Sequence, residues 1–147
     1  MELWSVNKIN LSCPAKLNLN LSVLSKKING MHEINTQFQL IDLFDEMIIK
    51  KTTSKDINVQ TNIVPSIDGE KNIVYKAIKE LSDYIGEDIY CDISIKKNIP
   101  LGGGLGGGSS NAAGALIGIN FLFELGLSSR DLKKIGKKLG ADVPFFI

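Results

Sequence analysis

Residues 100–114 contain the densest run of glycine in the chain. Six of the fourteen glycines fall between Gly102 and Gly108. A glycine buries no side chain and loses much backbone entropy on folding, so such a run is expected where a ligand must approach the backbone amides closely. The next residues, Ser109-Ser110-Asn111 and a small apolar run, are typical of the start of a buried helix. Free amides at the positive end of a helix dipole predict an anion site, and phosphate is the best candidate.

The expected phosphate contacts are the amides and hydroxyls of one continuous segment: Pro100, Leu101, Gly102, Gly103, Gly104, Leu105, Gly106, Gly107, Gly108, Ser109 and Ser110. Ser109 or Ser110 could also contact a Mg²⁺ ion, and no dedicated protein metal site is expected. The P-loop pattern does not fit, because no lysine lies between residues 100 and 120. A flexible linker is the alternative, but linkers are not normally followed at once by an apolar helix.

Three other positions could take part in chemistry. Residues 15–24 alternate between leucines and polar residues that include Lys16 and Asn18, and the spacing alone fits a solvated strand face as well as a functional one. His32 is the only histidine, and a lone histidine is more often structural. Asp142 lies between a helix end and an apolar segment, where its residue type alone predicts a cap or turn.

The residues from Pro100 to Ala113 resemble the second motif of the GHMP kinases, the superfamily of galactokinase, homoserine kinase, mevalonate kinase and phosphomevalonate kinase. Ser-Cys-Pro-Ala-Lys-Leu-Asn-Leu at 12–19 is similar to the first motif, and Gly-Ala-Asp-Val-Pro at 140–144 resembles the segment with the catalytic aspartate. The resemblance implies that Lys16 and Asp142 are catalytic, that Asn18 and Asn111 bind substrate, and that ATP with Mg²⁺ is the cofactor.

The long glycine form is similar to that of the members acting on 4-diphosphocytidyl-2-C-methyl-D-erythritol, a small molecule of the non-mevalonate isoprenoid pathway. This implies phosphorylation of its 2-hydroxyl. Those members carry Gly-Tyr-His where this chain has Gly30-Met31-His32. His32 is then expected to contact cytosine, while Met31 offers a weaker stacking surface than tyrosine. Two alternatives stay open: another GHMP kinase of the homoserine or mevalonate type, and a non-catalytic module that binds RNA or a protein.

Composition agrees with a globular enzyme. The chain has 147 residues, is 44% hydrophobic and 22% charged, and has a net charge of +1, so no broad basic surface for nucleic acid is expected. Neither a secretory signal nor an apolar run of membrane-spanning length is visible, which predicts a cytoplasmic protein. Cys13 and Cys91 lie in strand-like segments and are expected to be buried. The sequence does not indicate an oligomeric state.

Elements that must position these residues follow from hydrophobic periodicity. We expect strands at 3–12, 15–24, 33–50, 57–60 and 88–96, with Pro14 as an interruption, a turn at Asp42–Glu46, and a strand beginning near Val143. We expect helices at 72–85, at about 110–125 and after Ser128-Ser129.

The resemblance implies an α+β fold like domain 2 of ribosomal protein S5, with a mixed or antiparallel sheet covered by helices. Residues 1–147 would then be the N-terminal, ATP-binding domain of a kinase about twice as long. Because the C-terminal domain is absent from this sequence, we expect the 147 residues alone to be a poor or inactive kinase.

Overall fold

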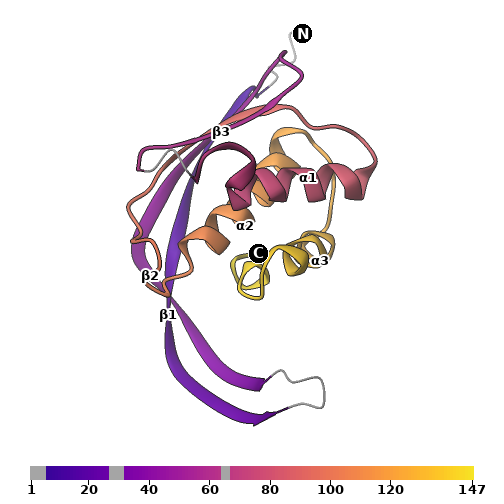
Figure 1. The fold of residues 1–147 in the computed structure, drawn as a ribbon. Coiled ribbons are helices and arrows are strands. Elements are labelled where there is room, and N and C mark those ends of the chain that lie inside the picture. The colour runs from indigo at the N-terminus through magenta and orange to yellow at the C-terminus, as the bar shows by residue number, and fades with distance from the viewer. Residues whose placement is uncertain (1–5, 27–31, 64–66) are drawn as a thin grey trace.

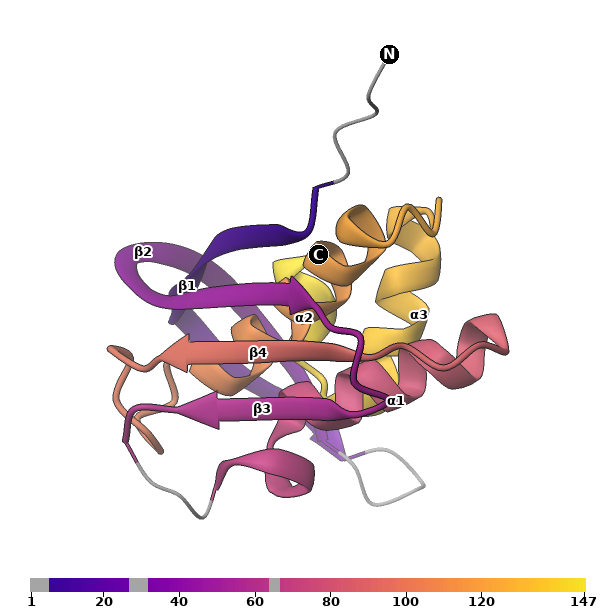
Figure 2. The same cartoon turned by 90° about the horizontal axis from the view of Figure 1, so that it is seen from above.

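The computed structural model describes residues 6–26, 32–63 and 67–147. They form two layers, a four-stranded sheet and a group of helices that covers one of its faces (Figures 1 and 2). The expected α+β class is confirmed. In chain order the elements are β1 (Lys8–Lys26), β2 (His32–Lys51), β3 (Ile57–Thr61), η2 (Gly69–Lys71), α1 (Ile73–Ile85), β4 (Cys91–Lys96), α2 (Gly107–Leu122), α3 (Ser129–Leu139) and η3 (Val143–Phe146).

The strands lie in the order β1-β2-β4-β3. β1 and β2 are antiparallel, β2 and β4 are antiparallel, and β3 is parallel to β4. A parallel pair needs a crossover connection, and α1 supplies it between β3 and β4. The expected mixed sheet covered by helices is therefore observed.

α2 lies at the centre of the core because its small residues let it approach the sheet closely. A Cβ atom on Gly114 would lie 2.7 Å from Cys13 Sγ, and one on Gly118 would lie 2.6 Å from Leu11 Cδ1. Neighbouring residues of α2 are fully buried. The helix begins at Gly107, three residues earlier than its sequence predicts, so part of the glycine run forms its first turn.

β1 runs without a break through Pro14, where the sequence predicts an interruption. The amide of Lys51 donates to the carbonyl of Asn7 at 3.0 Å, which sets the phase of the antiparallel ladder. Because hydrogen-bonded pairs alternate along the ladder, the backbone nitrogen of residue 14 faces away from β2. Proline therefore removes no ladder bond, and β1 is an edge strand, where proline is tolerated.

β2 likewise continues through Asp42–Glu46, so the predicted turn is wrong. The register changes there instead: Pro14 pairs with Phe44 while Ala15 pairs with Ile41, so residues 42–43 form a bulge. A bulge bends a strand without ending it, which explains why turn-forming residue types lie inside a long strand.

Beyond this bulge the β1–β2 hairpin extends past the helices (Figure 1). Two leucines of the alternating segment 15–24 are exposed here, Leu17 by 42% and Leu19 by 57%. Their alternation is that of a strand, but only tertiary structure decides whether a helix covers its apolar face.

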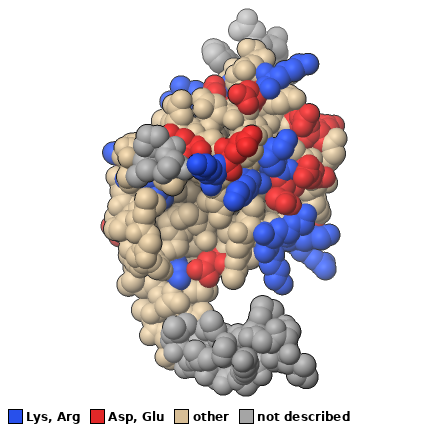
Figure 3. Space-filling view, viewed as in Figure 1, with Lys and Arg blue, Asp and Glu red and all other residues tan. Residues whose placement is uncertain are grey.

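Local capping signals correctly predict both ends of α1 and the start of α3. Asn72 accepts a hydrogen bond from the amide of Val74, and Gly86 closes α1 in the left-handed conformation with φ 77°. Ser128 and Asp131 form a reciprocal capping box at α3. Basic residues of α3 are exposed, as expected for a solvated face, and blue side chains gather beside this helix in Figure 3.

Two predictions near the ends of elements are wrong. The segment after Asp142 is the short 3₁₀ helix η3 rather than a strand, because Pro144 removes a donor and fixes a helical φ near its start. β4 begins at Cys91 rather than at residue 88. Both cysteines are buried as expected, and no helix in the described part of the chain is long and apolar enough to cross a membrane.

Candidate active site

The glycine loop joins the end of β4 to the start of α2 and surrounds a cavity of about 250 Å³. Gly102, Gly104 and Gly106 take left-handed φ angles of 74°, 69° and 73°, which other residues adopt only with strain. The cavity is lined by Ile73, Lys97 and the continuous segment from Pro100 to Ser109. The fold thus places the start of α2, with its free amides, beside a hollow formed largely by backbone.

The loop is held against the catalytic segment predicted in β1. The amide of Lys16 donates to the carbonyl of Leu105 at 2.9 Å. At Gly106 a Cβ atom would lie 3.0 Å from Lys16 Cγ and 3.0 Å from Phe146 Cζ. Glycine is therefore required here by conformation and by space, and the loop rests directly on the Lys16 side chain.

Lys16 and Asp142, which come from opposite ends of the chain, are adjacent. Lys16 Nζ lies 3.2 Å from Asp142 Oδ2 and donates to Asn18 Oδ1. The Phe38 ring centroid lies 4.6 Å from the same nitrogen. The Lys16 side chain is 6% exposed, whereas that of Asp142 is 35% exposed. The ammonium is thus fixed, and the carboxylate remains open to a ligand.

Asp142 owes its position to the packing of η3. It is the residue that precedes this short helix, which packs against both α2 and α3. Val143, the next residue, is fully buried against Gly136, where a Cβ atom would lie 2.9 Å from a Val143 methyl carbon. The buried valine anchors the segment, and Asp142 is held at its edge facing Lys16.

The two serines of the loop have different surroundings. Ser109 lines the glycine-loop cavity and is half-buried. Ser110 is 2% exposed, and its Oγ has no hydrogen-bond partner among the described residues. It lines a separate cavity of about 100 Å³ with Cys13, Pro14 and Phe146. Ser109 is therefore the hydroxyl that lines the glycine-loop cavity, and Ser110 is not in the lining of that cavity.

Asn111 does not face the Lys16 side of the site. It is 3% exposed, accepts a hydrogen bond from Lys97 Nζ at 2.8 Å and donates to Asp45 Oδ2 at 3.0 Å. The structure thus places Asn111 in a buried network behind the loop, and does not bring it to the expected substrate position. Met31 lies outside the described residues, and of His32 only the backbone is described, at the start of β2.

Sequence reasoning missed the charged pair beneath the loop. Lys97 Nζ contacts Asp45 Oδ2, and the two side chains are 4% and 0% exposed. The two residues are far apart in sequence, so no local pattern reveals that they pair. Nearby, burial raises the pKa of the Cys13 thiol to about 11, which keeps it protonated.

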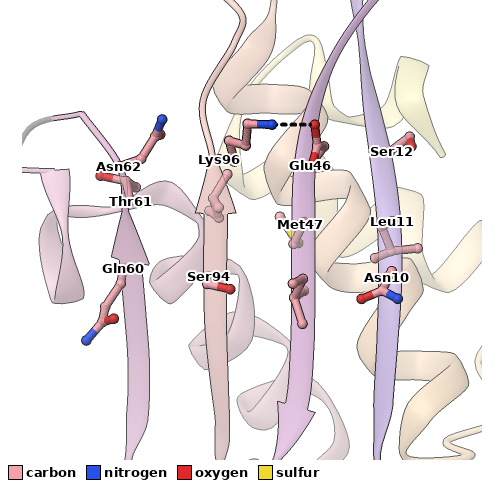
Figure 4. Close-up of a pocket in the computed structure, with 12 residues that line it drawn as sticks. Asn10, Leu11, Ser12, Glu46, Met47, Gln60, Thr61, Asn62, Ser94 and Lys96 are labelled. Atoms are coloured by element: carbon pink, nitrogen blue, oxygen red, sulfur yellow. Dashed lines mark hydrogen bonds and ion pairs between the residues drawn. The ribbon is translucent and has the colours of Figure 1, made fainter.

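A third cavity, of about 750 Å³, lies on the open face of the sheet (Figure 4). It is larger than the glycine-loop cavity but contains none of the predicted site residues. Its two charged side chains, Glu46 and Lys96, are paired at 3.0 Å and largely exposed. A surface ion pair of this kind offers no free titratable group, so we place the chemistry at the glycine loop.

Comparison with known proteins agrees with this geometry. The sequence model of one protein family, the GHMP kinases N terminal domain, matches residues 72–147, just over half of the chain. The chain belongs to the GHMP kinases. The matched region contains the glycine loop, α2 and Asp142. Lys16 and the hairpin precede it.

Two relatives at 41% and 46% sequence identity carry the same name. The chain is 46% identical over 142 residues to the 4-diphosphocytidyl-2-C-methyl-D-erythritol kinase of Geobacter sp. (strain M21), covering 97% of this chain and 51% of the relative. It is 41% identical over 139 residues to the kinase of that name from Methylococcus capsulatus (strain ATCC 33009 / NCIMB 11132 / Bath), covering 95% and 47%. This GHMP kinase chain therefore spans about half the length of these relatives.

Solved structures show the same relationship. A crystal structure of 4-(cytidine 5'-diphospho)-2C-methyl-D-erythritol kinase superimposes with a TM-score of 0.78 at 33% identity, over 94% of this chain and 48% of that one. Homoserine kinase from Cytophaga hutchinsonii matches with a TM-score of 0.71 at 20% identity, over 95% of this chain and 42% of that one. At that identity the second comparison shows the common fold alone, and the fold is that expected of an S5-like N-terminal domain.

Proposed function

We propose that residues 1–147 form the ATP-binding half of a kinase that phosphorylates the 2-hydroxyl of 4-diphosphocytidyl-2-C-methyl-D-erythritol. The observation that carries this proposal is the Lys16–Asp142 pair, 3.2 Å apart, at the edge of a loop that rests on the same lysine. The names of the 41–46% identical relatives favour this substrate over homoserine or mevalonate. A cytoplasmic location is part of the same proposal.

The residues present fit the phosphates of ATP. Backbone amides of the loop and of the first turn of α2 would hold them, since a side chain at Gly107 would collide with Ile99 at 2.9 Å and only glycine leaves the backbone bare there. Ser109 would add a hydroxyl and could contact Mg²⁺. When bound, ATP supplies an electrophilic phosphoryl group whose charge the metal partly neutralises.

The protein's own residues would position and deprotonate the attacking hydroxyl. Asp142, whose side chain is 35% exposed, would accept its proton. Lys16 places a positive charge where negative charge develops on the oxygen, and Asn18 restricts the ammonium to one position through its hydrogen bond. Phosphoryl transfer requires little covalent catalysis, so these groups and the loop supply the main parts of the site.

Binding of the cytidine end stays a prediction. We assign it to His32 at the start of β2, with Met31 beside it as the surface on which the base would lie. Methionine gives a weaker stack than an aromatic ring, so we expect modest selectivity for cytosine.

Calorimetric titration of the 147-residue chain with ATP–Mg²⁺, and separately with cytidine diphosphate, tests the binding part of the proposal. Binding of both nucleotides is the expected result. Tight, salt-sensitive RNA binding without nucleotide affinity would indicate an S5-like RNA-binding module instead.

Catalysis requires the second half. A chimera that continues residues 1–147 with the C-terminal half of the Geobacter kinase should phosphorylate diphosphocytidyl-methylerythritol, whereas the 147 residues alone should do so poorly. A substrate panel with homoserine and mevalonate should give lower kcat/KM values. Preference of the chimera for one of those alcohols would overturn the substrate assignment, and robust kinase activity of the 147 residues alone would refute the expected impairment.

A further inference from the structure

The buried network beneath the glycine loop centres on one carboxylate. Asp45 Oδ1 accepts hydrogen bonds from the amides of Asn98 at 2.8 Å and Ile99 at 2.9 Å. Asp45 Oδ2 accepts from Asn111 Nδ2 at 3.0 Å and contacts Lys97 Nζ. Asp45 is fully buried. One side chain of β2 thus contacts residues on both sides of the glycine loop.

This arrangement fixes the two ends of the loop relative to each other. Ile99 directly precedes the loop, and Asn111 belongs to the second turn of α2, which follows it. Glycine-rich segments lose much entropy when ordered, so a loop whose ends are already held needs less ordering when a ligand binds. Asp45 therefore has a mechanical role in shaping the anion site.

The same carboxylate creates an electrostatic difficulty. A buried negative charge beneath an anion site repels the ligand, and in a protein environment this repulsion extends over several ångströms. Lys97 compensates the negative charge of Asp45, because its ammonium contacts that carboxylate. The same ammonium lies close to the loop, 3.3 Å from the position that a Cβ atom on Gly107 would take. Among the described residues that line the glycine-loop cavity, Lys97 carries the only charge.

We propose that Lys97 is a positioning residue that acts through Asp45. It neutralises the carboxylate that holds the loop. The glycine loop is then fixed in place without an uncompensated negative charge beneath it that would repel phosphate. The inference rests on the proposed function, since it concerns the affinity of the same site for a nucleotide. It assigns roles to two residues that lie outside the catalytic pair and behind the loop.

Removing the two charges singly and together tests this role on the 147-residue chain, with ADP–Mg²⁺ as the probe. Lys97→Met leaves the carboxylate without its counter-charge, and we expect ADP affinity to fall at least tenfold. This follows because like charges roughly 10 Å apart, at an effective dielectric constant near 20, repel by about that factor. Lys97→Arg keeps the charge and should bind ADP within about threefold of the wild type.

The decisive variant is the double substitution Lys97→Met with Asp45→Asn, which restores neutrality without the lysine. We expect its ADP affinity to return to within about threefold of the wild type. A double variant that stays as weak as Lys97→Met would overturn the proposal, because it would show either direct phosphate contact by Lys97 or a purely structural role. Urea unfolding of each variant separates loss of stability from loss of affinity.

Two further outcomes keep the test decisive. If Lys97→Met does not fold, Lys97→Gln replaces it as the uncharged variant. It should bind ADP at least tenfold more weakly than the wild type and recover when combined with Asp45→Asn, and a failure to recover would refute the inference. If the wild type itself does not bind ADP, the proposed function fails. If the wild type binds ADP but the variants do not show the expected order of ADP affinities, only the role of Lys97 is refuted.

Discussion

A single methyl group at Gly106 should disturb both the stability and the chemistry of the site. Gly106 has a left-handed φ of 73°, and a Cβ atom there would lie 3.0 Å from Lys16 Cγ and from Phe146 Cζ. Gly106→Ala therefore imposes backbone strain and also forces these two side chains to move by a few tenths of an ångström. Gly126 provides a matched control, with φ 68° and no atom within 4 Å of the added carbon.

The two variants should differ by the cost of the close contacts. Left-handed backbone costs an alanine about 1–2 kcal/mol, and overpacking of a well-packed site adds about 1–3 kcal/mol. We expect Gly126→Ala to lower the free energy of unfolding by about 1–2 kcal/mol and Gly106→Ala by about 2–5 kcal/mol. Urea unfolding of the 147-residue chain measures both values with the same linear extrapolation.

The chemical consequence is measured in the chimera with the Geobacter C-terminal half. Displacing Lys16 from Asp142 should lower kcat about tenfold or more, since small misplacements of catalytic groups are costly. Gly126→Ala should leave kcat unchanged. Equal destabilisation by the two variants, together with an unaltered kcat for Gly106→Ala, would refute the idea that contact between the loop and Lys16 matters for the proposed catalysis.

Three further predictions concern single groups. Asp142→Asn in the chimera should lower kcat by about 10²–10⁴-fold while ADP affinity changes little, because the proposed role of the carboxylate is to accept a proton and not to hold phosphate. Burial raises the pKa of Cys13 to about 11 and of Cys91 to about 12, so the contribution of the two thiols to the free energy of unfolding should be constant below pH 8 and fall by roughly 1 kcal/mol per thiol by pH 10, where the unfolded thiols ionise and the folded ones do not. Ser128→Ala should destabilise the protein by about 1 kcal/mol through loss of the α3 cap, and Ser129→Ala by less.

Each of these has a clear contrary result. Steady-state kinetics in which the Asp142 variant keeps its turnover would remove the assigned base. Urea unfolding at pH 8 and pH 10 should show less alkaline loss for a Cys13→Ala and Cys91→Ala double variant than for the wild type; equal losses would contradict the burial argument. Equal stabilities of the Ser128 and Ser129 variants would show that the capping box contributes nothing.

Features specified by neighbouring residues could be predicted from the sequence. The Asn72 and Gly86 caps of α1 act within one helical turn, and so does the Ser128 cap of α3. The glycine loop belongs to the same class, since its left-handed residues and bare amides are local properties. Breaks at Pro14 and at Asp42–Glu46 were predicted wrongly, because the edge position of β1 and the paired bulge allow these residues inside strands.

Features that depend on distant contacts could not be predicted from residue patterns. The Lys97–Asp45 pair joins β2 to the segment before the loop, and neither residue type nor spacing indicates that two such charges are buried together. Ser110 and Asn111 were grouped with the phosphate and substrate contacts because of their place in the motif. The helical rotation of α2 against the sheet instead turns both inward.

By itself, the sequence determined that this protein has a glycine-rich loop at the start of a buried helix, because glycine content and helix initiation are local. Only the tertiary structure decided that Lys16 and Asp142 meet at its edge. That contact requires the loop to rest on β1 and η3 to pack against α2 and α3, and both depend on long-range packing that no stretch of sequence contains.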